Sequence, residues 1–458
     1  MAKKSFVFSR ERNIKMDFAK ITAPIFYVTP EPSRAIGLEK ALPNFHIVCL
    51  DDNLLVDLLV QRGVKVFSLE KKIGKDNQLL RTTGSVLESP HVWEYIEQNS
   101  QGEQPNILFF KPSKKIEAIA YSKKYRLLGN TSKLNNLYED KISFHKSCLS
   151  WDLPVVNGEI GLLESCSYDD LGKSYGQRLV IQFGHGWAGN TTFFVENEGD
   201  FKDLQAKFPK REVRITRFVQ GETYLVNACV TKEAILVSPP AIQITAPEGF
   251  TANLGGTCGR QWPAELSDKT EKQITQYTQM VGDKMRNQGY KGYFGLDFLL
   301  EEGTDKLFLS ECNARLTASV PIYTKMELKS GKTPLLFYHL LEFLGNSHQV
   351  ESYEKREVTG AELIIRNSQP RQMKVSGELA LGIYTYRQEL SFVKEGYSFE
   401  DIENPEEFFL LAAGQGRTIA PENEIARINT REKILDEEGK IKDWARRALL
   451  KAKEKLLI

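Results

Sequence analysis

One segment of the sequence restricts the fold more than any other. Residues 292–315, GYFGLDFLLEEGTDKLFLSECNAR, have the pattern of a β-hairpin. Two apolar runs flank a turn signal, Glu-Gly-Thr-Asp, at residues 302–305. A turn at this position places Asp297 of the first strand opposite Ser310 or Glu311 of the second.

The polar side chains of this hairpin have the composition of a magnesium site. Glu311, Asn313 and Arg315 are two residues apart, so they face the same side of their strand. Two carboxylates across a strand pair, here Asp297 and Glu311, repel each other and normally cost stability. Two acids and an amide give Mg²⁺ the oxygen ligands that it requires, with water and phosphate oxygens as the others. A solvated acidic hairpin is the simpler alternative, but the apolar surroundings of the acids favour a metal site.

Composition excludes several classes of function. The chain has 458 residues, enough for two to four domains, with 61 Lys and Arg against 60 Asp and Glu. The resulting formal net charge of +1 is too small to attract nucleic acid or an anionic membrane. The six cysteines form no CxxC pair, so neither a zinc site nor a disulfide framework is indicated. The sequence contains no signal-like apolar region and no run of eighteen apolar residues, so we expect a cytoplasmic protein with no membrane contact.

The N-terminal part of the chain, residues 1–128, is predicted to be a parallel α/β domain. From residue 20 onward, apolar strands alternate with helical stretches, which is typical of a parallel sheet covered by helices. The predicted strands are APIFYVTP, FHIVCLDD, VKVFSLE and NILFFKPS, and the predicted helices are PSRAIGLEKAL, NLLVDLLVQRG and KIEAIAYSKKY. No Gly-rich turn follows the first strand, so a dinucleotide-binding fingerprint is absent.

The C-terminal part, residues 346–458, is predicted to be a strand-rich domain with a closing helix. AELIIRN and ELALGIYTYRQELSFV read as strands, and the helix begins near Ile441. Its apolar stripe consists of Trp444, Leu449, Ala452 and Leu456. This stripe predicts a helix that packs on its own domain.

A Gly-rich segment, GHGWAG at residues 184–189, formally matches GxGxxG. It connects the strand at residues 179–182 to another strand at residues 190–195, whereas a dinucleotide-binding loop leads into a helix. A Gly-rich connection between strands can act as a flap whose amides close over phosphates, with an ordinary hairpin tip as the alternative. The candidate phosphate-binding residues of this flap are Gly184, His185, Gly186 and Gly189.

Taken in order, these features resemble the ATP-grasp superfamily. A lysine at a helix start, Lys141, comes first, and the flap, the hinge-like strand ITRFVQGETYLV and the hairpin ending in ExNxR follow. The resemblance covers roughly residues 20–345. It implies an α/β (α+β) fold in which an N-terminal parallel domain precedes a central ATP-grasp domain at residues 129–345. That domain would consist of a lid at about residues 155–220 and a core at residues 221–345, followed by the strand-rich C-terminal domain.

The resemblance implies ATP as a cofactor and assigns residues to it. Lys141 corresponds to the lysine that contacts the nucleotide phosphates. Arg217, Phe218 and Val219 fall where the hinge strand of the family binds the adenine edge through backbone groups.

The resemblance also assigns the metal and the reacting groups. Asp297, Glu311 and Asn313 match the ligands of Mg²⁺ (or Mn²⁺), and Arg315 matches the arginine near the transferred phosphate and the substrate carboxylate. From the residues alone, Arg260, beside a Gly-Gly turn, is a candidate for holding a substrate carboxylate, although a simple loop arginine is the alternative.

Two departures from the family pattern concern the nucleotide. The family usually has a second phosphate-binding lysine on the strand that enters the flap, where this chain has Gln182. The neutral amide could bind a phosphate, but the charge would have to come from His185 or another cation. The ribose-binding glutamate is expected at about Thr223, and Glu222 is one residue early, so ribose binding falls to one of these two.

The resulting hypothesis is an ATP-dependent carboxylate–amine ligase that releases ADP and phosphate. Its substrates would be small molecules, such as amino acids or peptides, and the enzyme could be a homodimer. Two alternatives stay open. ExNxR and the GIYTYRQ strand also resemble biotin-carboxylase-type members, and Gln182 would suit a nucleotide-binding protein without turnover.

Overall fold

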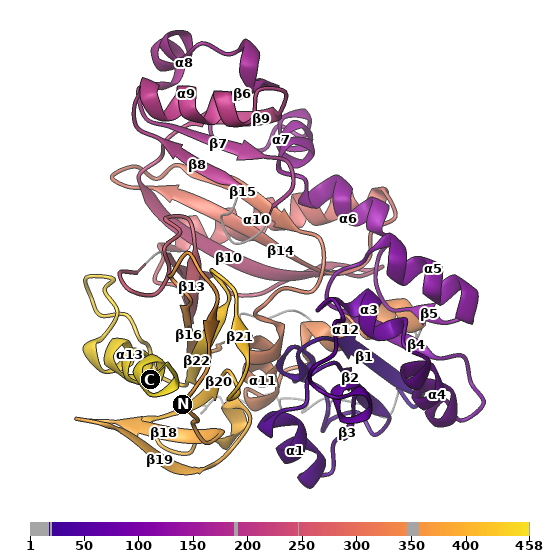
Figure 1. The fold of residues 1–458 in the computed structure, drawn as a ribbon. Coiled ribbons are helices and arrows are strands. Elements are labelled where there is room, and N and C mark those ends of the chain that lie inside the picture. The colour runs from indigo at the N-terminus through magenta and orange to yellow at the C-terminus, as the bar shows by residue number, and fades with distance from the viewer. Residues whose placement is uncertain (1–17, 19–20, 187–190, 246, 346–356, 458) are drawn as a thin grey trace, which may run out of the picture.

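The computed structural model describes residues 18, 21–186, 191–245, 247–345 and 357–457. Figure 1 shows an N-terminal region in indigo, a magenta lid above the rest, and a long sheet that runs from the lid into the orange and yellow C-terminal region.

The N-terminal region is a parallel sheet with helices around it, as the alternating pattern predicts. Its strand order is β3-β2-β1-β4-β5. The strands are β1 (Ile25–Thr29), β2 (Phe45–Cys49), β3 (Lys65–Ser68), β4 (Asn106–Phe109) and β5 (Arg126–Leu127). The helices are α1 (Leu54–Gln61), α2 (Glu70–Ile73), α3 (Thr83–Leu87), α4 (Pro90–Asn99) and α5 (Lys114–Lys123).

The helix predicted from PSRAIGLEKAL is wrong. Only a short 3-10 turn, η2 (Pro32–Ala35), forms there, and Ile36 after it is extended. The backbone N–H of Gly37 donates to the carboxylate of Glu39 at 2.5 Å, and Glu39 is held by a buried lysine. Tertiary contacts of one acidic side chain therefore override the local helical pattern.

The lid is a small antiparallel sheet with the strand order β6-β9-β7-β8. Its strands are β6 (Gly158–Leu162), β7 (Leu179–Phe183), β8 (Thr192–Val195) and β9 (Glu212–Arg217). The turn η3 (Leu163–Ser165) and the helices α8 (Tyr168–Tyr175) and α9 (Glu198–Lys207) complete it. A separate hydrophobic cluster, which includes Ile181, Phe201 and Ile215, holds the lid together.

The largest sheet joins the predicted core to the C-terminal strands. The described strands run in the order β15-β14-β10-β12-β13-β16-β22-β20-β18-β19, with β11 beside β10. The members before residue 346 are β10 (Gly221–Val230), β11 (Ile235–Val237), β12 (Ala241–Thr245), β13 (Thr257–Trp262), β14 (Gly292–Glu301) and β15 (Leu307–Asn313). The members after it are β16 (Gly360–Arg366), β18 (Gly382–Tyr386), β19 (Leu390–Glu395), β20 (Glu407–Ala412) and β22 (Glu424–Thr430). Because β13 pairs with β16, the C-terminal strands extend the same sheet.

Helices cover the core part of this sheet and connect it to its neighbours. They are α6 (Ser132–Glu139), α7 (Lys141–Ser150), α10 (Asp268–Asn287), α11 (Val320–Lys329) and α12 (Leu335–Leu344). The remaining short elements are β17 (Met373–Lys374), η4 (Phe399–Asp401) and β21 (Thr418–Ile419). Among the helices that the structure describes, none is both long and apolar enough to cross a lipid bilayer.

The closing helix forms where the sequence predicts it. It is α13 (Asp443–Leu456), and its residues Leu449, Ala452 and Leu456 are fully buried in the C-terminal core. Trp444 stacks on Phe408 with ring centroids 5.6 Å apart. The predicted packing of the helix on its own domain is therefore confirmed.

A buried ion pair connects three distant segments of the chain. Lys325 of α11 lies 2.7 Å from Glu39 and 3.0 Å from Glu400, and its side chain is 2% exposed. The hydroxyl of Tyr397 also donates to Glu39, at 3.0 Å. Breaking a buried pair by removing one partner leaves an unpaired charge and is strongly destabilising.

We therefore expect Glu39→Gln to lower the free energy of unfolding by about 3 kcal/mol. Thermal and urea unfolding of the full chain would measure this loss. Asp170→Asn is the matched control, because the pair of Asp170 with Lys173 is almost fully exposed and should contribute nothing measurable. Equal midpoints for Glu39→Gln and the control would contradict a stabilising role for the buried pair.

Candidate active site

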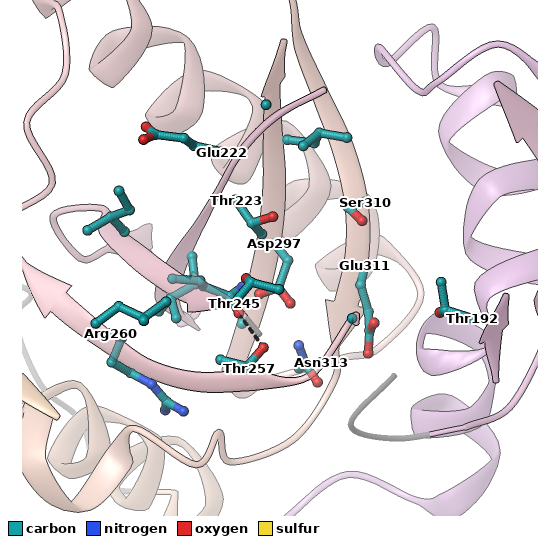
Figure 2. Close-up of a pocket in the computed structure, with 18 of the residues that line it drawn as sticks. Thr192, Glu222, Thr223, Thr245, Thr257, Arg260, Asp297, Ser310, Glu311 and Asn313 are labelled. Carbon is teal, nitrogen blue, oxygen red and sulfur yellow. Dashed lines mark hydrogen bonds between the residues drawn. The ribbon is translucent and has the colours of Figure 1, made fainter. Parts of the chain in front are cut away.

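The predicted hairpin is present with the predicted pairing of its acids. Strands β14 and β15 are antiparallel, and Asp297 is the register partner of Glu311. The next pair is Phe298 with Leu309, so Ser310 is an extra residue and forms a β-bulge. Bulges of this kind increase the local twist and re-aim side chains, often at functional sites. In Figure 2, Asp297, Glu311 and Asn313 point into one common space.

The two carboxylates have opposite electrostatic surroundings. Burial, followed by repulsion from Glu311, raises the pKa of Asp297 to about 7. Burial would also raise the pKa of Glu311, but the Nζ of Lys141 lies 2.6 Å from its Oε2 and lowers that pKa instead. Without a further cation, the pair therefore resists carrying both negative charges at neutral pH.

Lys141 reaches this acid pair because of how helix α7 begins. Asp140 caps the helix by accepting from the backbone N–H of Ser143 at 2.8 Å. The backbone N–H of Lys141 donates to the carbonyl of Gly184 at 2.8 Å, which ties the helix start to the beginning of the flap. The lysine side chain is 6% exposed and lines the cavity. The structure thus brings Lys141 together with the hairpin acids, as the sequence predicts.

The oxygen donors around Asp297 suit a hard divalent cation. No group of three or more His, Cys, Asp or Glu side chains that could hold a metal is found within the described part of the chain. Asp297, Glu311 and the amide of Asn313 would therefore share a cation with oxygens of a ligand or of water, as Mg²⁺ prefers. The Nη2 of Arg315 donates to the Oδ1 of Asn313 at 2.9 Å and orients this amide.

Arg315 lies next to the metal cluster, and its ion pair is with an acid outside the hairpin. Its Nε lies 2.5 Å from Glu139 at the end of α6, not beside a hairpin acid. Its guanidinium also stacks over the ring of Phe110, 4.7 Å from the centroid. These contacts hold the planar group in place at the cavity wall.

The hinge residues line the cavity between lid and core. Arg217, Phe218 and Val219 connect β9 to β10. The N–H of Phe218 donates to the carbonyl of Arg178, and the side chain of Arg217 pairs with Glu301 at 2.6 Å. No partner for the N–H of Val219 is present among the described residues, so this backbone group is available to a ligand.

Glu222 and Thr223, the two candidates for ribose binding, both line the cavity on β10. The carboxylate of Glu222 accepts a short hydrogen bond from the hydroxyl of Tyr224. Figure 2 places Glu222 away from the three metal-site side chains, with Thr223 nearer to them. The choice between these two residues stays a prediction.

The flap is only partly involved in the cavity. It connects the antiparallel strands β7 and β8, as predicted, and Gly186 lines the cavity. A side chain at Gly186 would collide with Thr191. Gly184 and His185 do not line the cavity, and Nε2 of His185 lies 3.5 Å from Asp140 instead. The predicted phosphate contact of His185 has no support in this geometry, and Gly189 lies outside the described residues.

The cation that the sequence analysis missed is Arg214. It is the register partner of Gln182 on the neighbouring lid strand, and its Nε donates to Oε1 of Gln182 at 3.0 Å. Arg214 lines the cavity and is 6% exposed. Burial lowers its pKa to about 10, so it remains charged at neutral pH. Only the pairing of β7 with β9 brings these two residues together, and the sequence alone does not reveal it.

Arg260 reaches the same cavity from β13. Its side chain is 8% exposed, and the nearest carboxylate, that of Glu362, lies 3.6 Å from its Nη2. Burial and then repulsion by Arg427 and Arg34 lower its pKa, against the attraction of Glu362. The interpretation as an ordinary loop arginine is therefore wrong, because the residue is a buried cation on a strand.

These residues surround one cavity of about 1180 Å³ between lid, core and C-terminal strands. Pockets for single small ligands usually have about 300–1,000 Å³, so this space can hold a nucleotide together with a second molecule. The hinge and Gln182 line it together with the acids of the hairpin and Arg260.

Comparisons with known proteins agree with this architecture. No protein-family model matches the chain, and no curated protein sequence matches it either. A biotin carboxylase from Campylobacter jejuni is similar in structure, with a TM-score of 0.62 and 15% identity over 96% of this chain and 92% of that chain. An N5-carboxyaminoimidazole synthetase from Staphylococcus aureus complexed with ADP has a TM-score of 0.56 and 10% identity, over 94% and 97% of the two chains.

A third similar structure is the dimeric biotin carboxylase domain of 2-oxoglutarate carboxylase from Hydrogenobacter thermophilus, in complex with MgADP, ADP and bicarbonate. Its TM-score is 0.59, with 12% identity over 89% of this chain and 86% of that chain. At such low identities the likeness establishes the fold. The protein has the ATP-grasp fold that its motifs predict.

The raised pKa of Asp297 predicts how the free energy of unfolding depends on pH when no metal is bound. The native protein keeps a proton on Asp297 up to about pH 7, whereas the unfolded chain loses it near its ordinary value of 3.8. The free energy of unfolding therefore falls as the pH rises through this window. We expect Asp297→Asn to raise the unfolding midpoint in EDTA, by an amount that grows from pH 4.5 to pH 7 and is constant above.

Urea unfolding of both proteins at several pH values would measure this difference. Added Mg²⁺ should shrink it, because a bound cation stabilises the wild-type carboxylate. A difference that does not change with pH would contradict the assigned electrostatics.

Proposed function

We propose that this protein is an ATP-dependent ligase that activates a carboxylate as an acyl phosphate and joins it to an amine. The observation that carries the proposal is the cluster of Asp297, Glu311 and Asn313, which shares one cavity with Lys141 and Arg315. Cations and metal-binding oxygens at one point suit a triphosphate that is about to transfer its terminal group.

ATP would extend from the hinge to the hairpin. The free N–H of Val219 is suited to the adenine edge, and Lys141 is suited to the phosphates. Asp297, Glu311 and Asn313 would hold Mg²⁺ (or Mn²⁺), which when bound supplies positive charge to the phosphate oxygens. The proteins with the same fold include structures complexed with ADP and with MgADP, which supports these cofactors.

Arg214 takes the place of the second phosphate-binding lysine in this proposal. It is a buried cation whose hydrogen bond to Gln182 directs it towards the cavity. It also lies 3.4 Å from the carbonyl of Ser310, the bulged residue beside Glu311. In the proposed complex the phosphate-binding cation of the lid would therefore lie on β9, as Arg214, and not on β7, where this chain has Gln182.

The reaction needs no nucleophile from the protein. An oxygen of the substrate carboxylate attacks the γ-phosphorus and ADP leaves, which forms the acyl phosphate. The amine then attacks the carbonyl carbon, loses a proton and expels phosphate. Arg315, held by Glu139 and Phe110, is positioned to stabilise the negative charge that develops on the oxygens.

The partners in this reaction are a small-molecule carboxylate and an amine, such as amino acids or peptides. A cytoplasmic location and a homodimeric state remain predictions. The dimer of the Hydrogenobacter carboxylase domain supports the second of these.

A biotin-carboxylase-like reaction is the second candidate function. It is favoured by the likeness to biotin carboxylase over 96% of this chain, which includes the C-terminal strands. In that case bicarbonate would be the carboxylate that is activated, and bicarbonate alone would stimulate ADP release.

Trapping with hydroxylamine tests the proposed acyl phosphate. With MgATP and a panel of amino acids and dipeptides, we expect carboxylate-dependent ADP release and hydroxamate formation. Glu311→Gln removes one charge from the metal cluster and should lower the rate at least a hundredfold. Asp170→Asn, far from the cavity, is the control. AMP formation would overturn the mechanism, and ATP binding without hydrolysis in any pool would favour a binding protein.

The proposed phosphate contact of Arg214 can be tested by moving the positive charge from β9 to the neighbouring strand β7. A charge-assisted hydrogen bond to phosphate contributes about 1.5–3 kcal/mol, so Arg214→Gln should raise the KM for ATP at least tenfold. Gln182→Lys combined with Arg214→Gln should restore much of the affinity, because the charge returns from the neighbouring strand. An unchanged KM for ATP in Arg214→Gln would exclude a role of Arg214 in phosphate binding.

A further inference from the structure

The end of the cavity beyond the metal cluster is rich in positive charge. Its lining there includes five cationic side chains: Arg34, Lys111, Arg260, Arg315 and Arg366. The acids among the described lining residues are Asp297 and Glu311 of the metal cluster and the exposed Glu222 and Glu248. Glu139, which lies behind the wall, pairs with both Lys111 and Arg315. If a divalent cation occupies the hairpin acids, no other buried carboxylate among the described lining residues is left to balance Arg34, Arg260 and Arg366.

Arg34 joins this cluster from the N-terminal region. It belongs to the short turn η2, and its Nη1 is buried without a hydrogen-bond partner within the described residues. Its guanidinium lies 5.0 Å from the centroid of Phe110, the ring that also carries Arg315. The nearest acid, Glu31, is 3.7 Å away and about half exposed. One aromatic ring therefore holds two guanidinium groups close to each other.

Arg260 approaches the same space from the sheet. Its Nε is buried and has no hydrogen-bond partner in the described part of the chain. The nearest acid is Glu362, which lies 3.6 Å from Arg260 but 3.1 Å from Arg427. Glu362 therefore pairs more closely with Arg427 than with Arg260. Repulsion from Arg34 and Arg427 acts on Arg260. A buried, poorly paired charge is costly unless a ligand completes it.

Arg366 adds a third cation, and no carboxylate within the described residues forms an ion pair with it. It donates to the carbonyls of Thr257 at 2.9 Å and of Glu422 at 3.2 Å. These neutral acceptors fix the side chain. Its charge acts only at longer range on Glu424, which already pairs with Arg427.

We propose that the carboxylate substrate carries a second anionic group, a carboxylate or a phosphate, which binds between Arg34 and Arg260. This inference rests on the proposed ligase function and narrows its substrate. The reacting carboxylate lies beside Arg315 and the metal cluster, and the second anion lies farther along the sheet.

The strand order gives the separation of the backbones that carry the two parts of the site. Asp297 lies on β14 and Arg260 on β13, with β10 and β12 between them. Three strand spacings of about 4.8 Å separate their backbones by roughly 14 Å. The side chains reach into the cavity between these backbones: Arg34 and Arg315 share the ring of Phe110, and the charge of Asp297 acts on Arg260. The two anionic groups would therefore lie closer together than the backbones, as at the two ends of a short carbon chain.

Calorimetric titration of the full-length protein, saturated with MgADP, tests the proposal. The probes are valerate, glutarate and 4-phosphonobutyrate, which share a short chain and differ in the second group. We expect one of the two dianions to bind at least tenfold more tightly than valerate, and the preferred dianion distinguishes a carboxylate from a phosphate. Arg34→Gln should remove this advantage and leave valerate unchanged. Arg387→Gln, an exposed arginine that pairs with Glu406, should behave as wild type.

Arg260→Lys keeps the positive charge but loses the planar guanidinium group. It should therefore lower the binding affinity for the dianion less than Arg34→Gln does. Thermal unfolding would confirm that each variant is folded. The proposal would be overturned if all three probes bound with equal affinity or if none bound at millimolar concentrations. It would also be overturned if Arg34→Gln lowered the affinity for valerate as much as the affinity for the dianions.

The failure of the proposed function is distinguishable from the failure of this inference. If monocarboxylates support hydroxylamine-dependent ADP release as well as dianions do, the second-anion site is wrong and the ligase stands. If dianions bind through Arg34 but no carboxylate supports ADP release, the site stands and the ligase is wrong.

Discussion

The repulsion between Asp297 and Glu311 is the constraint on which the rest of the site depends. The hairpin register and the bulge at Ser310 place the two carboxylates opposite each other. Lys141 neutralises one of them, and the pKa of the other rises to about 7. A fold that keeps such a pair in a closed space gives up stability and gains affinity for a cation. The arrangement is therefore understandable as a binding site and not as a stabilising contact.

Part of this site was predictable because it is encoded locally. Alternation on one strand and a turn of known position place Asp297 opposite Glu311 without tertiary information. Lys141 lies at the helix start where the sequence places it, after the capping Asp140. Its assignment to the phosphates came from the resemblance to the ATP-grasp superfamily and stays a prediction. The parallel N-terminal sheet and the helix α13 follow from equally local patterns.

The sequence did not reveal Arg214 and Arg34, because their positions depend on contacts between distant segments of the chain. Arg214 becomes relevant only because β9 lies beside β7, which brings it to Gln182. Arg34 lies on a turn where the sequence predicts a helix, and the contact of Glu39 with Lys325 decides the outcome. Neither the pairing of β9 with β7 nor the contact of Glu39 with Lys325 can be predicted from hydrophobic periodicity. The phosphate contact of His185 stays a prediction, and in the structure His185 lies 3.5 Å from Asp140.

The continuity of the large sheet explains how residues from the core and from the C-terminal strands come to line one cavity. Because β13 pairs with β16, Arg260 and Glu362 become cross-strand neighbours, and Asn429 of β22 follows Glu362 in register. Polar side chains therefore continue across the sheet from the metal cluster into the C-terminal strands. Lid residues such as Gln182 and Arg214 line one part of the cavity, whereas the C-terminal strands and η2 contribute Arg366 and Arg34 to its lining. Different segments of the chain therefore form different parts of the cavity wall, so in the proposed ligase the nucleotide and the carboxylate would be bound by separate elements of the fold.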